Sequence, residues 1–218
     1  MSTQRRDGLP VTQWGVDAGD AALAVLAVHG RAQGPSFLRE TARRFGAAPV
    51  RFYAPEAEGN TWYPRPFLEP LASNQPDLDE SLATVDGYLA ALAGAGFPPE
   101  RVVPWGFSQG ACLLAHHVLT APRRFAGLVL CTGGHVGPDP LPPPAGTPLR
   151  GVPAVVRSVE DDPWVPSHRV RETAELLRRA GADVDLRIDP GTEHVITDEA
   201  CAAATRLLVA TAARAGPR

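Results

Sequence analysis

Lysine is absent from this sequence: all 21 basic residues among its 218 are arginine, and they stand singly or in pairs. With 24 acidic residues the formal net charge is −3, and the chain has no basic stripe of the kind that holds a phosphate backbone. We therefore expect no nucleic acid among the partners of this protein.

Long apolar runs are also missing. No stretch approaches the roughly 18 to 20 uninterrupted apolar residues that span a bilayer. Residues Met1–Pro10 are polar and carry no apolar signal segment. The sequence thus predicts a soluble, cytoplasmic protein without a membrane span, whose residues 1–10 form a flexible tail.

Cysteine is scarce. Cys112, Cys131 and Cys201 are odd in number and lack the paired spacing of a zinc site or of a redox C-x-x-C motif. We interpret all three as small core residues. The sequence therefore predicts neither a metal nor a cofactor.

The chain is long enough and apolar enough to form one globular core. Domains average about 150 residues, so 218 residues favour a single domain over residues 1–218. With 44% hydrophobic and 21% charged residues, the chain has apolar surface to bury and too little bias for disorder. Collagen-like, coiled-coil and low-complexity classes are excluded.

Short apolar runs alternate with helical patterns along most of the chain. Strands are predicted at 21–28, 50–54, 101–107, 125–131, 154–158 and 184–188. Helices are predicted at 36–45, 78–93, 109–119, 167–179 and 198–213. This alternation predicts an α/β domain of three layers with a mostly parallel central sheet.

Two irregular segments, 55–76 and 135–153, each follow a predicted strand. Ligands of open α/β sheets bind beyond the carboxyl ends of the strands, where such connections form natural walls. The aromatic residues Trp62, Tyr63 and Phe67 favour a cavity wall in the first segment. The second is rich in proline and is either a wall or a stiffened surface loop.

Residues Gly106–Gly110 read G-x-S-x-G and stand directly between a predicted strand and a predicted helix. A serine at such an elbow is held in a strained conformation, next to a helix N-terminus that favours negative charge. The bare pattern is common in unrelated proteins, but this context favours Ser108 as a nucleophile.

A serine nucleophile needs a base, and the base needs an acid that orients it. His194 follows the last predicted strand and precedes the last helix, where a catalytic histidine would lie over the serine. The acid candidates Glu160, Asp161 and Asp162 all follow the strand at 154–158. The residues alone leave the choice among these three open.

The other histidines are less suited to act as the catalytic base. His116 and His117 lie on the elbow helix and point away from its N-terminus, so we interpret them as packing or surface residues. His168 begins a helix and is expected in solvent. His135 follows the strand after the elbow and is a candidate for the cavity lining, whereas His29 is expected to hold its own loop.

An oxyanion hole requires two backbone donors. The N–H of Gln109, directly after Ser108, is the first candidate. The second usually comes from a loop after an earlier strand, here residues 29–34, and we predict the N–H of Arg31.

Several blocks of sequence together resemble one family. They read VHGRAQGP from Val28, GFSQGA from Gly106, VEDDPWVP from Val159 and GTEH from Gly191. In this order they resemble the α/β-hydrolase group of carboxylesterases, lysophospholipases and acyl-protein thioesterases. The stretch NTWYPRPFLEPL from Asn60 looks like a bacterial branch of the same group. The similarity covers nearly the whole chain.

The resemblance assigns roles. It implies an α/β-hydrolase fold without a cap domain, with Ser108 as nucleophile and His194 as base. Asp162 fills the D-P-x-V-P position and would be the acid. The same similarity places the oxyanion donors at Arg31 and Gln109.

The implied activity is that of a serine carboxylesterase acting on small to medium esters or thioesters through an acyl-enzyme. We expect a shallow, open site walled by Trp62, Tyr63, Phe67 and Trp164, with His135 beside them. The alternatives are a non-catalytic ligand-binding protein, a peptidase, and a lactone or dienelactone hydrolase on the same fold. The sequence leaves the oligomeric state open, and a homodimer is one candidate.

Two positions depart from the pattern. Pro104 lies inside a predicted central strand, where its missing N–H predicts fraying or a bulge. Arg31 stands where many members of the group carry an apolar residue, which leads to the hypothesis of a preference for polar or anionic substrates.

Overall fold

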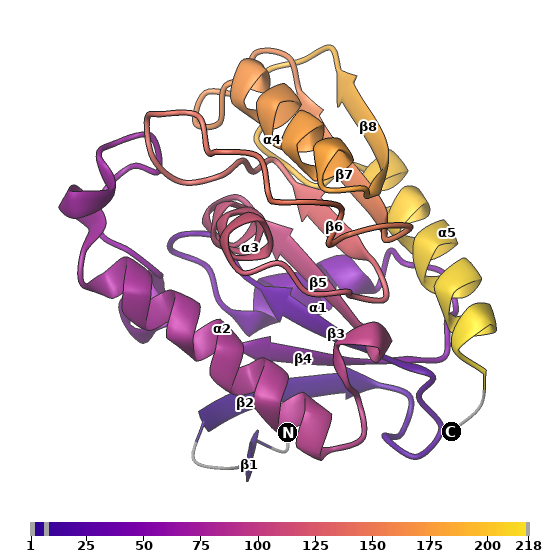
Figure 1. The fold of residues 1–218 in the computed structure, drawn as a ribbon. Coiled ribbons are helices and arrows are strands. Elements are labelled where there is room, and N and C mark those ends of the chain that lie inside the picture. The colour runs from indigo at the N-terminus through magenta and orange to yellow at the C-terminus, as the bar shows by residue number, and fades with distance from the viewer. Residues whose placement is uncertain (1–2, 7–8, 217–218) are drawn as a thin grey trace.

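The computed structural model describes residues 3–6 and 9–216, which form an eight-stranded sheet in the order β1-β2-β4-β3-β5-β6-β7-β8 (Figure 1). Neighbouring strands from β4 to β8 are parallel. The parallel strands are β3 (Leu23–Val28), β4 (Val50–Pro55), β5 (Val102–Phe107), β6 (Leu128–Cys131), β7 (Pro153–Val159) and β8 (Asp183–Asp189). The antiparallel β1 (Thr3–Arg6) and β2 (Leu9–Gly15) extend the sheet beyond β4.

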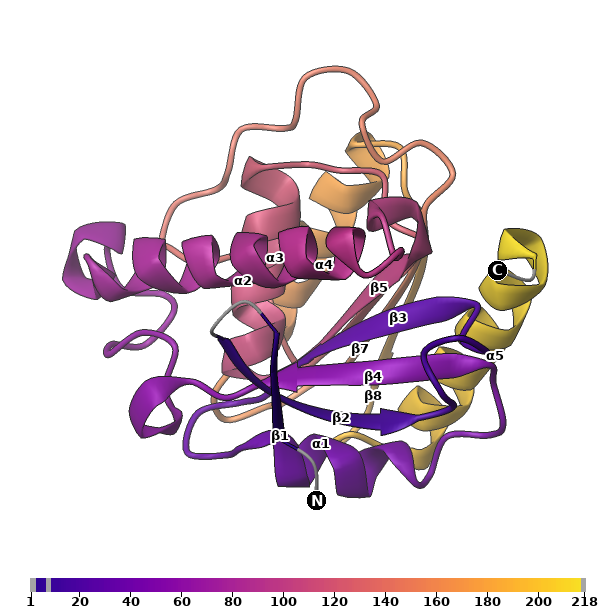
Figure 2. The ribbon, with the colours of Figure 1, turned by 90° about the horizontal axis from the view of Figure 1, so that it is seen from below.

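Helices cover both faces of the sheet (Figure 2). The α-helices are α1 (Pro35–Ala42), α2 (Asp77–Gly94), α3 (Gln109–Thr120), α4 (Ser167–Arg179) and α5 (Asp198–Ala215). Short 3₁₀ helices lie at η1 (Glu58–Asn60), η2 (Leu71–Asn74) and η3 (Pro99–Arg101). One apolar cluster joins the sheet to α2, α3 and α4, and a second joins its other face to α1 and α5. The predicted α/β fold of three layers is confirmed.

The prediction of a tail over residues 1–10 differs from the structure. Residues 3–6 and 9–10 belong to β1 and β2, while residues 1–2 and 7–8 lie outside the described part. The strands form because β2 adds its backbone to the free edge of β4. Val11 is buried and the ring of Trp14 stacks on Phe52 with centroids 5.1 Å apart, which fixes this edge. Backbone pairing at an edge leaves little hydrophobic signal, and the polar sequence did not reveal it.

Pro104 does not interrupt β5. The register between β5 and β3 runs without a break from Ala24↔Val102 to Val28↔Gly106, so there is no bulge. Ser108 N–H donates to Cys131 O of β6, and successive residues of a strand face alternate neighbours. The nitrogen of Pro104 therefore faces the β6 side, where pairing begins only at Trp105↔Val129. The hydrogen bond that Pro104 cannot donate would therefore lie just outside the paired part of β5 and β6.

None of the helices within the described ranges is both long and apolar enough to cross a membrane.

The turn from β5 into α3 is set by close packing. Ser108 has φ 52° and ψ −123°, a conformation that a non-glycine residue adopts only under tertiary constraint. A Cβ built on Gly110 would lie 2.2 Å from Val28 O and 2.5 Å from His29 O. A Cβ on Gly106 would lie 2.6 Å from Ala111 Cα. Gly110 is therefore needed so that the first turn of α3 can lie on the end of β3, and Gly106 so that the same turn can lie against β5.

This packing predicts that Gly110→Ala destabilises the fold, because the two carbonyl oxygens belong to backbone and cannot rotate away. We expect a loss of at least about 2 kcal/mol, which corresponds to a melting temperature lower by about 4–8 °C for a chain of this length. Thermal unfolding followed by circular dichroism measures it. Gly94→Ala is the matched control, since a Cβ there meets nothing within 4 Å. Equal melting temperatures for the two variants would contradict the packing argument.

Candidate active site

Three polar side chains from separate segments meet beyond the carboxyl ends of β5, β7 and β8. Ser108 Oγ lies 2.8 Å from His194 Nε2, and His194 Nδ1 lies 2.7 Å from Asp162 Oδ2. The hydroxyl can donate to Nε2 while Nδ1–H donates to the carboxylate. The structure thus brings together the serine, histidine and aspartate that the sequence singled out.

The carboxylate of Asp162 is held at both oxygens. Its Oδ1 accepts the backbone N–H groups of Trp164 and Val165, each at 2.9 Å, while Oδ2 faces His194. Burial opposes ionisation of this carboxyl, but the hydrogen bonds from His194 and the two N–H groups outweigh it and hold the pKa of Asp162 below its usual range. The group is therefore a fixed negative charge at neutral pH.

The two neighbouring acids lie elsewhere. Glu160 accepts hydrogen bonds from Ser167 and Arg171 at the surface, and Asp161 is exposed. Of the three candidates, Asp162 alone contacts His194.

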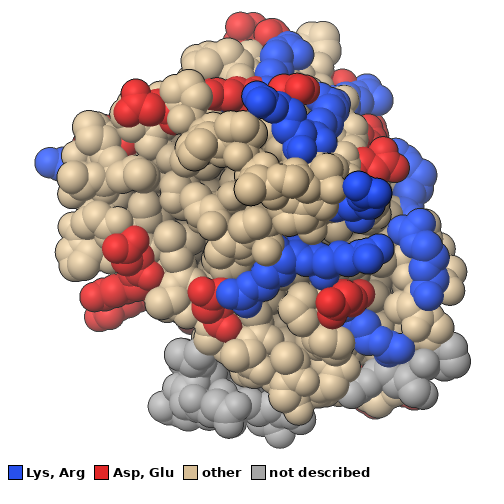
Figure 3. Space-filling model, in the orientation of Figure 1, with Lys and Arg blue, Asp and Glu red and all other residues tan. Residues whose placement is uncertain are grey.

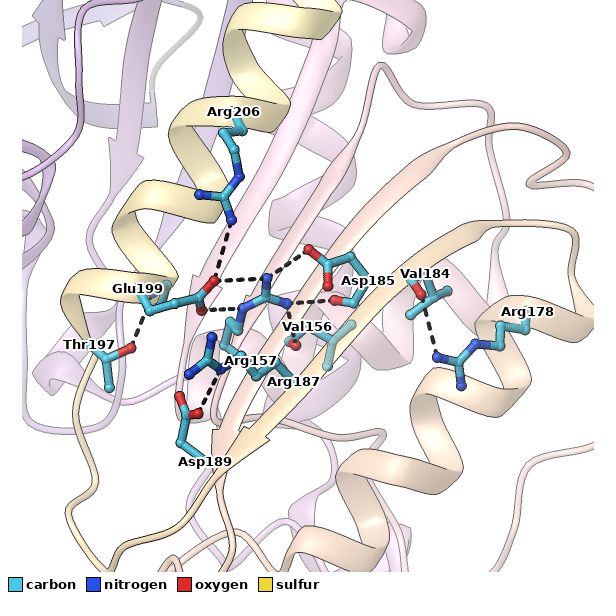
Figure 4. A network of polar contacts seen from close by, with 11 residues as sticks. Val156, Arg157, Arg178, Val184, Asp185, Arg187, Asp189, Thr197, Glu199 and Arg206 are labelled. Atoms are coloured by element: carbon cyan, nitrogen blue, oxygen red, sulfur yellow. Dashed lines mark hydrogen bonds and ion pairs between the residues drawn. The ribbon is translucent and has the colours of Figure 1, made fainter.

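The segment that carries His194 runs from the end of β8 to the start of α5, and both of these flanking elements are tied to β7. Arg157 of β7 is nearly buried and donates to Glu199 of α5 at 2.6 Å and to the Asp185 carboxylate of β8 at 2.7 Å (Figure 4). The same guanidinium reaches the carbonyl of Asp185 at 2.7 Å. The His194 ring packs on Phe107, with centroids 5.0 Å apart. The sequence did not predict this network.

The loop expected to supply an oxyanion donor lies against the serine. A Cβ on Gly30 would come within 3.1 Å of Ser108 Cβ. The loop is held by Ala32, whose φ is +58° and whose N–H donates to Asn60 O at 2.8 Å. Arg31 directly follows Gly30, and Arg31, Ser108 and Gln109 line the same cavity.

His29 fixes the same loop from beneath. Its Nε2 accepts the N–H of Ala57 at 3.1 Å, so Nδ1 carries the proton and donates to Gly30 O at 2.7 Å. Burial lowers the pKa of His29 and keeps the ring neutral. This contact set fits the structural role that the sequence favoured.

A cavity of about 480 Å³ opens beside Ser108. It is lined by Arg31, Ala32, Tyr63, Pro64, Pro66, Phe67, Ser108, Gln109, Cys112, Trp164 and Val165. Trp164 is 71% exposed at its rim, whereas Tyr63, Cys112 and Val165 are buried.

On the face shown in Figure 3, arginine gathers on the right with acidic side chains among it, and much of the left is uncharged.

Of the predicted wall residues, Tyr63, Phe67 and Trp164 line this cavity, whereas Trp62 and His135 do not. Trp62 turns inward, where its Nε1 donates to His29 O at 2.8 Å. His135 is fully buried and lies against Thr173 and Arg169 of α4. Both side chains meet polar partners inside the protein, and the chain sequence does not show on which side a loop residue will point.

Sequence reasoning missed Cys112 and Val165 as lining residues. Cys112 lies four residues after Ser108 on α3, so helical spacing places it on the same face, one turn deeper. Burial raises the pKa of the Cys112 thiol to about 12, so it lines the cavity as a neutral group. Across residues 3–6 and 9–216 no group of three or more His, Cys, Asp or Glu side chains could hold a metal ion.

Comparison with known proteins identifies the family of this chain. The family described as Phospholipase/Carboxylesterase matches residues 45–211. The crystal structure of a phospholipase/carboxylesterase from Dyadobacter fermentans is 29% identical, with a TM-score of 0.85 over 94% of this chain and 98% of that one. A carboxylesterase from Mesorhizobium loti shares the fold at 23% identity, with a TM-score of 0.72 over 92% of this chain and 94% of that one.

Curated relatives match a shorter stretch. Acyl-protein thioesterase 1 of Gibberella zeae is 31% identical over 109 residues, which are 48% of this chain and 46% of the relative. Acyl-protein thioesterase 1 of Schizosaccharomyces pombe is 27% identical over 115 residues, 51% of this chain and 50% of the relative. The matched stretch thus spans about half the length of these relatives. On the strength of the match over residues 45–211, the chain belongs to the phospholipase/carboxylesterase family of the α/β-hydrolase fold.

Proposed function

We propose that this protein is a cofactor-independent serine hydrolase that cleaves carboxylic esters or thioesters through an acyl-enzyme. The observation that carries the proposal is the hydrogen-bonded series Ser108, His194 and Asp162 at the edge of an apolar cavity. The family to which the chain belongs, and relatives named carboxylesterase and acyl-protein thioesterase, support the same reaction class.

The acylation step uses contacts already in place. Ser108 Oγ attacks the carbonyl carbon while its proton passes to His194 Nε2. The carbonyl oxygen becomes an oxyanion, for which the N–H groups of Arg31 and Gln109 are the proposed donors. When the tetrahedral intermediate collapses, the bond to the alcohol or thiol breaks, and the leaving group takes the proton from Nε2.

Deacylation repeats these steps with water as the nucleophile. His194 removes a proton from water, the resulting hydroxide attacks the acyl carbon, and Ser108 leaves with the proton from Nε2. Throughout, the charge on Asp162 stabilises the imidazolium and keeps the proton of neutral His194 on Nδ1. Because two backbone N–H groups fix the other carboxylate oxygen, Asp162 cannot turn away from the ring.

The cavity supports an apolar acyl group of small to medium size. Its buried part is formed by Tyr63, Phe67, Cys112 and Val165, and its open side lies beside the exposed Trp164. Ionised Asp162 faces His194 rather than this space, so its charge does not oppose an apolar chain there. A cytoplasmic location and a homodimer stay predictions of the sequence.

The direct test is removal of the nucleophile. We expect Ser108→Ala to lower kcat for p-nitrophenyl butyrate by about 10⁶, the scale found when a triad serine is removed. A fluorophosphonate probe should label the wild type at Ser108, as located by peptide mass spectrometry, and should leave the variant unlabelled. An active Ser108→Ala enzyme, or a label on another residue, would reject the proposal.

Replacement of Asp162, the proposed acid, gives a second test of the mechanism. Asp162→Asn keeps the side-chain shape but removes the charge, and its amide can favour the wrong tautomer of His194, so kcat should fall by about 10⁴. Asp161→Asn is the matched control, because Asp161 is exposed and adjacent. Comparable losses in the two variants would show that Asp162 does not act as the acid.

Acyl length probes the cavity. Each buried CH₂ contributes about 0.8 kcal/mol, so kcat/KM should rise about fourfold per methylene until the cavity is filled. We expect p-nitrophenyl butyrate to exceed the acetate, with little further gain for the octanoate. Phe67→Leu, which shortens one wall, should shift the optimum toward longer chains. An unchanged chain-length profile in this variant would place the acyl group outside the cavity.

A further inference from the structure

One backbone carbonyl in the cavity wall accepts hydrogen bonds from both residues proposed as oxyanion donors. Tyr63 O lies 2.7 Å from Arg31 Nη2 and 2.7 Å from Gln109 Nε2. Thr61 Oγ1 donates to the same oxygen at 3.2 Å. The wall segment 61–65 is thus joined at one atom to the loop after β3 and to the start of α3.

The guanidinium of Arg31 extends across this segment. Nη2 also donates to Arg65 O at 3.1 Å, and Nη1 donates to Pro64 O at 3.0 Å, so three consecutive carbonyls share one planar group. Its Cζ lies 6.0 Å from the centre of the Tyr63 ring. No ion pair of Arg31 occurs within the described ranges, so its donors are directed at the wall.

The side chain of Gln109 holds the same segment from the other side. Its Oε1 accepts Trp62 N–H at 3.0 Å, and its Nε2 donates to Tyr63 O. Only 6% of Gln109 is exposed, so these bonds are shielded from water. Gln109 directly follows Ser108, and Arg31 directly follows Gly30, which lies against Ser108, while both side chains hold the cavity wall.

We propose that Arg31 is a positioning residue that locks the acyl wall and the oxyanion loop into one unit. The inference rests on the proposed hydrolase function and assigns Arg31 no contact with an anionic group of the substrate. The loop carrying the Arg31 N–H cannot shift relative to Tyr63 without breaking hydrogen bonds to three carbonyls. A guanidinium suits this task because its donors form a rigid fork, whereas a lysine ammonium is a point charge on a flexible stem.

The charge of Arg31 offers a rival explanation, a preference for anionic substrates, and two substitutions separate the two ideas. Arg31→Lys keeps the charge and loses the fork, whereas Arg31→Leu loses both. Steady-state kinetics would be measured with p-nitrophenyl butyrate and with the p-nitrophenyl monoester of succinic acid, whose acyl chain ends in a carboxylate. Arg124→Lys and Arg124→Leu are matched controls, because Arg124 is exposed and lies between α3 and β6.

Positioning predicts that both Arg31 variants lose about tenfold or more in kcat on both esters, since an oxyanion donor is displaced for either substrate. The ratio of kcat/KM between the two esters should stay within about twofold of the wild-type ratio. The inference is overturned if Arg31→Lys retains wild-type kcat. It is also overturned if Arg31→Leu loses activity on the anionic ester alone.

Hydrogen exchange supplies a readout that does not need activity. In Arg31→Lys, the amides of residues 61–63 and of Arg65 should exchange at least about tenfold faster than in the wild type, and the Arg124 variants should not differ from it. Unchanged exchange in Arg31→Lys, or faster exchange with unchanged kcat, would overturn the positioning role. If wild-type Ser108 takes up no probe and hydrolyses no ester, the proposed function fails, and the exchange experiment still decides whether Arg31 holds the wall.

Discussion

The close approach of the first turn of α3 to the end of β3 is the constraint on which the site depends. Gly110 packs directly on the carbonyls of Val28 and His29, and that contact leaves no room for a side chain. It places Ser108 in its strained conformation and aligns the loop at Gly30 beside the serine. Strain of this kind persists only where the surrounding structure imposes it, and here a buried parallel sheet does so.

Polar side chains then hold the irregular segments around this fixed point. Arg157 ties both flanks of the His194 segment to β7, and Arg31 spans the wall segment. Arg169 of α4 is buried and donates to the carbonyls of Gly137 at 2.6 Å and Pro138 at 2.7 Å. A guanidinium serves such segments well, because their carbonyls lack the regular partners that helices and strands provide.

Much of the architecture could be predicted from the sequence because its signals are local. The apolar run at β3 predicts a strand buried on both faces, and α4 begins at Ser167 and ends at Arg179, the range predicted from the sequence. The edge strands β1 and β2 were not predicted from the sequence, because a polar segment forms strands there mainly through backbone pairing. Pro104 gave a misleading signal, because a proline is tolerated where the ladder has not yet begun.

The sequence by itself determined the fold class, the elbow at Ser108 and the candidate partners of that serine, since glycine spacing and strand-to-helix order are written in consecutive residues. The residue pattern left three candidates for the acid, and the family resemblance pointed to Asp162, which in the structure lies against His194. Only the tertiary structure decided which aromatic side chains face the cavity. Asp162 and Trp62 differ from their neighbours by the direction in which each side chain points. That direction is fixed by hydrogen-bond partners far away in the chain, which a single sequence does not bring together.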